Sequence, residues 1–298
     1  MAELTQSPVQ KSLSIGRLYR LASHVLPYVP PALGYRLCEQ LGFLAPHLPV
    51  WEQILLNLAH VLPHKTEAVR RRYALEVISN LGKNYYDLLR SHALSAEELD
   101  RTVDIQGLEN VREFVAQRKP VIAAIPHIGN ISLVAEPMAT RIQRPLMVVV
   151  EQMADPVAHD LLNKLRRRRN VEMVEIGPRT PRTIMQGLRD GKVIVLASDR
   201  TVADATVEVE FFGASARVPS GPAVLALRTG ATLLTAFTYR QPNNHSTVVI
   251  DPPLALDPRG DLHADVQRTM QAVIRIFESY IRHHPSQWLI TEPVWRTA

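Results

Sequence analysis

The sequence predicts an α/β fold with a central sheet, mostly parallel or mixed, that is flanked by helices and preceded by an amphipathic helical region. Two observations carry this prediction. From residue 103 onward, short apolar runs alternate with helical segments, which is typical of a sheet covered by helices. Before residue 100, apolar residues recur three and four positions apart, which is the period of a helix.

The N-terminal helical pattern extends over residues 12–95. Apolar residues recur at helical spacing over 18–26, and Pro27 and then the pair at 30–31 should end this helix, because proline has no amide hydrogen to donate inside a helix. The same spacing resumes over two further stretches, 55–62 and 67–89.

Amphipathic helices that carry arginines beside apolar residues either pack on the rest of the protein or lie on a bilayer. Both interpretations stay open here. We expect residues 1–100 to form a membrane-associating helical region and residues 101–298 to form the α/β core, the two making one structural unit. The chain has no stretch of about 18 uncharged apolar residues, so we expect no transmembrane helix.

The core region contains runs typical of strands. Buried strands are expected where the run is continuously apolar, at 121–125, 146–150 and 193–197. Half-exposed strands are expected where apolar and acidic residues alternate, at 171–176 and 207–211, and two more strands at 232–239 and 247–250. Helices are expected at 181–189, 219–229 and 262–284, since proline precedes and glycine follows the first two.

Composition limits the kind of protein. Of 298 residues, 46% are hydrophobic and 21% charged, which is a globular balance, and the single cysteine, Cys38, excludes a disulfide framework. The net charge of +5 includes runs of arginine at 70–72 and 166–169, which favour an anionic partner. Aromatic residues make up only 6% and mostly lie away from these runs, so a membrane surface or an anionic small molecule is favoured over nucleic acid.

The strongest local signal is the segment 126–132. It follows a predicted buried strand, contains His127 and Gly129, and offers Asn130 as the N-cap of a helix. A histidine placed there can exchange a proton near neutral pH, and Gly129 allows a ligand to approach the backbone closely. A lone histidine in a loop more often only satisfies hydrogen bonds, and that interpretation stays open on this segment alone.

The His-x-Gly-Asn sequence at 127–130 resembles the histidine block of the bacterial lipid A biosynthesis acyltransferases, a family of the lysophospholipid acyltransferase superfamily. Within this family, the phosphatidylinositol mannoside acyltransferases are the most similar branch. Further matching segments follow in the family's order, at 199–200, 207–213, 217–223, 225–231 and 284–288.

This resemblance implies transfer of a fatty acyl group from a thioester, acyl-CoA or acyl carrier protein, to a hydroxyl of a glycolipid or phospholipid-type acceptor. His127 would be the general base that activates the hydroxyl. The chemistry requires no metal and no cofactor beyond the acyl donor as co-substrate. The resemblance further implies a peripheral protein on the cytoplasmic side of the plasma membrane.

One position departs from the family pattern, in which an acidic residue stands five positions after the histidine. Here that position is Ser132, which cannot balance the charge of a protonated imidazole. The alternative function is therefore a catalytically weak relative that binds acyl chains or lipids. Glu136 lies one helical turn further on and is a poor substitute beside Pro137.

Other charged residues match family positions. We expect Glu208, with Glu151, to orient His127, making Glu208 the second catalytic residue; for each acid, a solvated strand residue is the alternative. The expected substrate-binding residues are Gly129, Asn130, Glu151, Arg166, Arg200 and Arg217. The run 167–169 is assigned only to surface or membrane electrostatics. Gln287 and Trp288 are expected to position the C-terminal helix.

Overall fold

The computed structural model describes residues 8–201 and 205–295 and contains a central sheet in the order β1-β9-β8-β2-β5-β3-β4. In chain order its strands are β1 (Val103–Gln106), β2 (Val121–Ile125), β3 (Leu146–Val150), β4 (Val171–Glu175), β5 (Val193–Ala197), β8 (Thr232–Arg240) and β9 (Ser246–Ile250). All neighbouring pairs are parallel except β8 with β9. The predicted α/β class and its mostly parallel sheet are confirmed.

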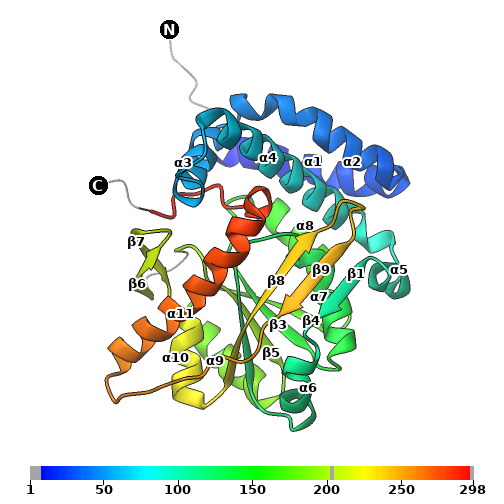
Figure 1. Cartoon of the computed structure of the whole chain (residues 1–298). Coiled ribbons are helices and arrows are strands. Elements are labelled where there is room, and N and C mark those ends of the chain that lie inside the picture. The colour runs from blue at the N-terminus through cyan, green and yellow to red at the C-terminus, as the bar shows by residue number, and fades with distance from the viewer. Residues whose placement is uncertain (1–7, 202–204, 296–298) are drawn as a thin grey trace.

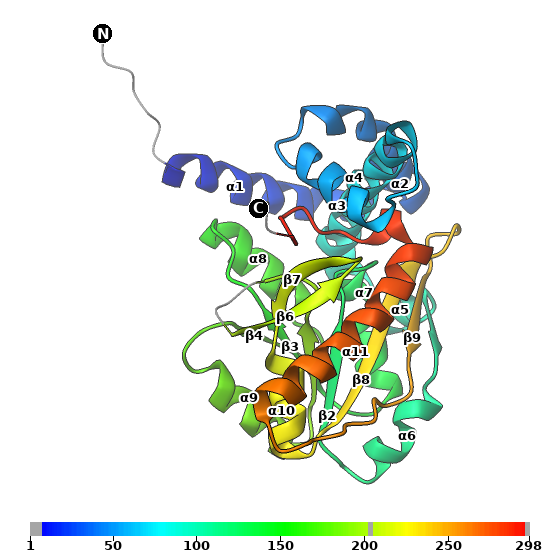
Figure 2. The ribbon, with the colours of Figure 1, turned by 60° about the vertical axis from the view of Figure 1, so that its left-hand side comes forward.

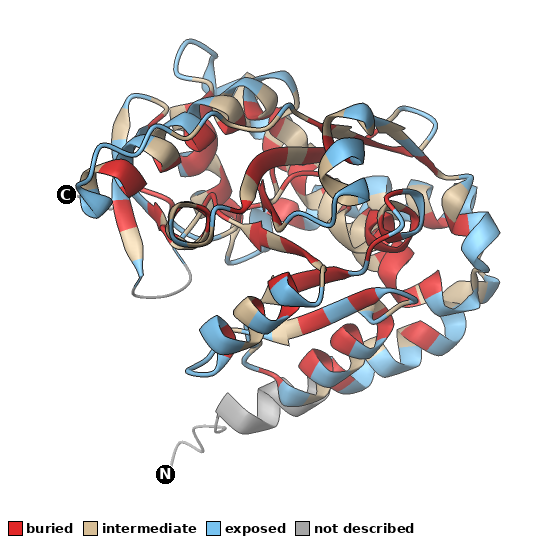
Figure 3. Ribbon diagram, turned by 90° about the horizontal axis from the view of Figure 1, so that it is seen from below, coloured by how far each residue is buried: buried red, intermediate tan, exposed pale blue. Residues whose placement is uncertain are grey.

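Helices cover both faces of this sheet (Figure 1). Side chains along each strand point alternately to the two faces, so each face has its own apolar cluster. In β2, Ile122 and Ala124 face one apolar cluster, while Val121 and Ala123 face the other. The first cluster is closed by α9 (Thr180–Arg189), α10 (Gly221–Thr229) and α11 (Leu262–His283), and the second by α6 (Glu109–Ala116) and α7 (Ile131–Arg141). Buried residues are accordingly concentrated in the strands and on the helix faces that cover them (Figure 3).

A separate antiparallel hairpin, β6 (Thr206–Phe211) with β7 (Ala214–Pro219), lies outside the central sheet. Residues 207–211 were expected to be a strand, as they are, but β7 was not expected. Phe212 and Gly213 connect the two strands, and both have positive φ, as a two-residue type I′ turn requires. The alternate residues of β6 pack on α11 as part of the first apolar cluster.

The N-terminal helices form a layer at one end of the sheet (Figure 2). They are α1 (Pro8–Val25), α2 (Pro31–Gln40), α3 (Trp51–Val61) and α4 (Glu67–Arg90), with α8 (Pro156–Arg166) packed against α1. The short helix α5 (Ala96–Asp100) packs against α7 beside the sheet. The prolines act as expected: α1 ends before Pro27 and α2 begins at Pro31. Among the described residues, no helix has the length and apolar character to cross a membrane.

Candidate active site

A short segment, the histidine loop (residues 126–130), connects β2 to α7. The Asn130 side chain accepts a hydrogen bond from the Leu133 amide at 3.2 Å, which confirms Asn130 as the N-cap of α7. His127 therefore lies at the carboxyl end of a fully buried strand, where open parallel sheets bind their ligands.

Gly129 meets a different need from the one expected. Its φ is +66°, and a Cβ atom at this position would lie 2.1 Å from the Thr238 carbonyl oxygen of β8. The close approach that glycine permits here is therefore to the neighbouring backbone. The expected role of Gly129 in making room for a ligand stays a prediction.

Asp199 is the acid that holds His127. The Nδ1 atom of His127 lies 2.6 Å from Asp199 Oδ1, and the His127 amide donates to Oδ2 at 2.8 Å. β2 and β5 are paired in parallel with Ile125 opposite Ala197, and each of the two residues follows its strand by two positions. Because the two chains leave the sheet in register, their side chains meet at its carboxyl edge.

The Asp199 carboxylate is fully buried, whereas 31% of the His127 side chain is exposed. Burial by itself raises the pKa of Asp199, but the neighbouring His127 and the hydrogen bonds from His127 and Trp288 outweigh it, so that the pKa lies below its ordinary value. An ionised Asp199 can only accept a hydrogen bond. The ring therefore carries its proton on Nδ1 and donates it to Asp199 in a hydrogen bond. The Nε2 lone pair is then left to accept a proton.

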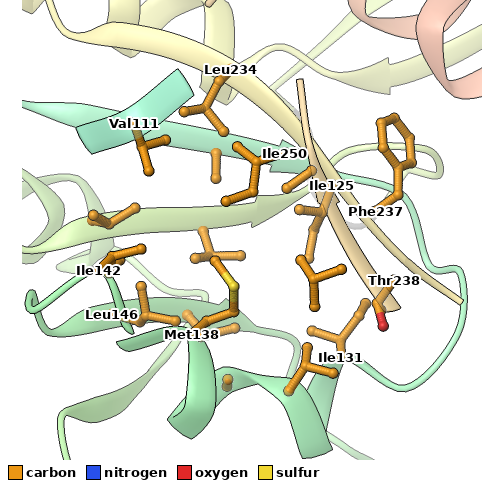
Figure 4. A pocket seen from close by; sticks show the side chains of 18 of the residues that line it. Val111, Ile125, Ile131, Met138, Ile142, Leu146, Leu234, Phe237, Thr238 and Ile250 are labelled. Carbon is orange, nitrogen blue, oxygen red and sulfur yellow. The ribbon is translucent and has the colours of Figure 1, made fainter. Parts of the chain in front are cut away.

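An apolar cavity of about 80 Å³ lies beside this pair, between the sheet and helices α6 and α7. Ile125 and Pro126, which directly precede His127, form part of its wall. Figure 4 shows Ile125, Ile131 and Thr238 toward one end of the cavity, with Val111 and Leu146 toward the other. The lining is almost entirely hydrocarbon, so it can accept an apolar group but offers almost no partner to a polar one.

The comparison with known families decides the identity. The family model described as "Bacterial lipid A biosynthesis acyltransferase" matches residues 11–297. The chain belongs to this family. The predicted family is confirmed, and with it the prediction of an acyltransferase of lipid biosynthesis.

Curated relatives extend over most of the acyltransferase. A phosphatidylinositol mannoside acyltransferase of Mycobacterium tuberculosis (strain ATCC 25618 / H37Rv) is 28% identical over 249 residues, which cover 82% of this chain and 77% of the relative. The protein of the same name from Mycolicibacterium smegmatis is 24% identical, covering 82% and 79%. The lipid A biosynthesis lauroyltransferase of Escherichia coli (strain K12) is 24% identical over 281 residues, covering 93% and 88%.

The orienting role expected of Glu208 in this acyltransferase is met instead by Asp199. Glu208 is exposed on the β6–β7 hairpin, opposite Arg217, and accepts a hydrogen bond from the Ser215 hydroxyl at 2.6 Å. The sequence did carry a signal for Asp199, which lies two positions after the predicted strand 193–197. Recognising its role required knowing that this strand lies beside the strand of His127.

Glu136 does not replace the acid that is missing at Ser132. It is buried and pairs with Arg168 at 2.5 Å, and Arg168 also donates to the carbonyls of Ser91 and Leu94. Arg168 was assigned to the surface, and this is wrong. The arginine run leaves helix α8 at Arg166, so its side chains point in different directions and one of them reaches the interior.

Glu151 and Arg200 come together at the same edge of the sheet, since they follow β3 and β5. Arg200 donates to Glu151 at 2.5 Å and lies 3.8 Å from a carboxylate oxygen of Glu292. The partly buried guanidinium of Arg200 thus lies near two carboxylates, and Arg200 directly follows Asp199 in the chain. No contact that the structure gives for Glu151 joins it to His127.

Two further arginines, Arg166 and Arg217, were expected to bind substrate. Arg217 is exposed on β7. Arg166 ends α8, and burial lowers the pKa of its guanidinium, opposed by the Tyr85 hydroxyl. Their roles in binding substrate stay predictions.

The C-terminal segment contributes more to the site than expected. The indole Nε1 of Trp288 donates to Asp199 Oδ2 at 2.8 Å, so that the acid receives hydrogen bonds from both sides. The carbonyl of Gln287 accepts the Gly129 amide at 3.0 Å, and the Leu289 amide donates to the His127 carbonyl at 2.9 Å. Gln287 and Trp288 were expected to position the C-terminal helix. Through these bonds they also position the histidine loop and Asp199.

Within 8–201 and 205–295, no three His, Cys, Asp or Glu side chains are grouped so that they could hold a metal ion.

Proposed function

We propose that the protein transfers a fatty acyl group from an acyl-CoA or acyl carrier protein thioester to a hydroxyl of a glycolipid or phospholipid-type lipid. The observation that supports this most is the pairing of a partly exposed His127 with a buried Asp199 directly beside an apolar cavity. The names of the relatives, phosphatidylinositol mannoside acyltransferase and lipid A biosynthesis lauroyltransferase, support a glycolipid as the acceptor.

The geometry accounts for each proton in such a transfer. His127 Nε2 takes the proton of the acceptor hydroxyl while the oxygen attacks the thioester carbonyl. Asp199 keeps the proton on Nδ1 and stabilises the imidazolium that forms. As the new C–O bond forms and the C–S bond breaks, the imidazolium returns its proton to the departing thiolate, which leaves as a free thiol.

The alternative, a weak relative that only binds lipids, depended on the missing acid at position 132. Asp199 supplies an acid from another strand, and the reason for expecting weak activity is removed. Purified protein should release free thiol from an acyl-CoA only when a lipid acceptor extract is present, and mass spectrometry should find the acylated lipid. Binding of acyl-CoA with no acceptor-dependent thiol would overturn the enzymatic proposal.

The apolar cavity, of about 80 Å³, is proposed to hold part of the acyl chain of the donor. Ala135 of α7 lines it and is buried, so an Ala135→Leu side chain would occupy part of its volume. We expect the ratio of kcat/KM for a sixteen-carbon donor to that for a ten-carbon donor to fall at least about tenfold, since one displaced methylene changes discrimination by about 10–200-fold.

Both donors are assayed on one preparation of the variant. A loss of folded enzyme lowers both kcat/KM values equally and therefore cancels in their ratio. An unchanged ratio in a folded variant would place the acyl chain elsewhere.

We further propose that the enzyme binds the cytoplasmic face of the plasma membrane through an apolar surface on α1 and α2. Large apolar side chains are exposed there, on the turn that joins the two helices and on the segment that follows α2: Ile15, Leu18, Leu21, Val25, Tyr28, Leu33, Leu37, Leu41, Phe43 and Leu44. Exposed Arg17, Arg20 and Arg36 accompany them. Arginines beside an apolar helix face are suited to anionic headgroups.

The double substitution Leu18→Gln, Leu21→Gln tests this surface, because these side chains are 62% and 63% exposed and their loss removes apolar area from the contact. We expect the affinity for vesicles of phosphatidylglycerol and phosphatidylcholine to fall at least about tenfold, given about 1.5–3 kcal/mol for a buried leucine. Flotation of the protein with the vesicles measures it.

Leu262→Gln is the matched control, since Leu262 is also exposed but begins α11 at the opposite end of the molecule (Figure 2). Equal loss in both variants, or loss in neither, would contradict the proposed surface.

A further inference from the structure

Two side chains of helix α4 are bonded to the backbone that follows His127. Asn84 donates its amide to the Gly129 carbonyl at 2.7 Å, and Asp87 accepts the side-chain amide of Asn130 at 3.0 Å. Both contacts join segments that lie more than 40 residues apart in the chain. The N-terminal layer is thus attached directly to the histidine loop.

Asp87 also forms a buried ion pair. Its side chain is 3% exposed, that of Arg240 is 4% exposed, and the two lie 2.7 Å apart. The Tyr35 hydroxyl of α2 donates to the other carboxylate oxygen at 2.7 Å. Removing two charges from water costs several kcal/mol per ion, and apolar replacements are often as stable. A contribution to folding stability is therefore a weak explanation for the presence of this ion pair beside the histidine loop.

The hydrogen bonds around Gly129 form a closed ring. The Gly129 amide donates to the Gln287 carbonyl at 3.0 Å, and the Gln287 side chain donates to the Arg240 carbonyl at 2.8 Å. Arg240 donates through Nη2 to the Asn84 side-chain oxygen at 2.8 Å, and Asn84 donates back to the Gly129 carbonyl. Both polar backbone groups of Gly129 are fixed by this ring, two positions after His127.

We propose that Asn84 and Asp87 are positioning residues that fix the histidine loop, and that the N-terminal layer thereby controls the placement of His127. This inference rests on the proposed function. The His127 ring must keep Nδ1 on Asp199 while Nε2 faces the substrate, and a shift of about 1 Å in such a group can cost about 10²-fold in rate. Fixing the Gly129 peptide restrains the backbone that sets the direction of the ring.

Asn84→Ala tests the proposal, because it opens the ring while leaving the Asp87–Arg240 ion pair in place. We expect kcat to fall about 10–100-fold with the KM for the acyl donor changed less than about twofold. The amide hydrogens of residues 128–129 should exchange faster, as measured by mass spectrometry of the peptide that contains them.

Asn80→Ala is the matched control. Asn80 lies one turn earlier on α4 and also donates its side-chain amide to a backbone carbonyl, that of Ser286 in the short 3-10 helix after α11, at 2.9 Å. It should leave kcat and the exchange of the histidine loop near the wild-type values. Equal exchange of that loop in both variants, or a wild-type kcat in folded Asn84→Ala, would overturn the positioning role.

The exchange measurement separates this inference from the proposed function. Faster exchange in Asn84→Ala alone, in a protein whose wild type transfers no acyl group, would keep the role of α4 in holding the loop and overturn the assigned chemistry.

Discussion

Replacing His127 with alanine is expected to reduce kcat for acyl transfer by about 10²–10⁴-fold, the usual contribution of a general base. Among the contacts of the described residues, the His127 ring is the only imidazole bonded to Asp199, and the substitution removes it. The variant should still fold, because the backbone amide at position 127 and the Trp288 indole continue to donate to Asp199. Acceptor-dependent thiol release at saturating donor and acceptor measures the effect.

Acyl-CoA should still bind to the His127→Ala variant with nearly unchanged affinity, since the apolar cavity is lined by other residues. Calorimetric titration of the donor checks this. His92→Ala, at an exposed position before α5, is the control and should keep full activity. A folded His127→Ala protein with more than about a tenth of the wild-type rate would remove His127 from the proton transfer.

Asp199→Asn should also reduce kcat by about 10²–10⁴-fold, with little change in the KM of either substrate. Asparagine keeps the shape but has no negative charge to stabilise the imidazolium, and its amide can present a donor to Nδ1.

Folding stability provides a second measurement on the same variant. The pKa of Asp199 is lowered in the folded protein, so the carboxylate stabilises the fold above its ordinary pKa of 3.8 and loses this contribution as the pH falls through its folded-state pKa. The free energy of unfolding should therefore fall less steeply with acid in Asp199→Asn than in the wild type, as urea titrations from about pH 6 to about pH 3 would show.

Glu208→Gln is the matched control for both measurements, since Glu208 is exposed and hydrogen-bonded to Ser215. It should keep a rate within about twofold of the wild type, because exposed pairs of this kind contribute little. A large loss in Glu208→Gln with full activity in Asp199→Asn would reverse the assignment of the orienting acid.

The parts of this site that could be predicted from the sequence are those set by neighbouring residues. The continuous apolar run of β2, the loop with His127 and the Asn130 cap are all encoded within about ten residues, and the structure has each of them where expected. The pairing with Asp199 depends on β5 lying beside β2. Strand order is not a local property, so the choice among the acids of the family segments could not be made in advance.

Burial of individual charges was equally hard to predict. Arg168 belongs to a run that is uniformly basic, yet it alone of the last three reaches a buried carboxylate, Glu136. The hairpin strand β7 contains Arg217 and ends at Pro219, which hid its strand character. In each case the decisive partner comes from a distant part of the chain.

The bonds from α4 to the histidine loop have a practical consequence for protein engineering. A shortened chain that began at residue 101 would keep the sheet but leave the Arg240 guanidinium with no counter-ion and the Gly129 carbonyl with no donor from Asn84. Helix α4 is in this sense a structural part of the proposed active site. The proposed membrane-binding surface is better tested by exchanging its exposed leucines than by truncation.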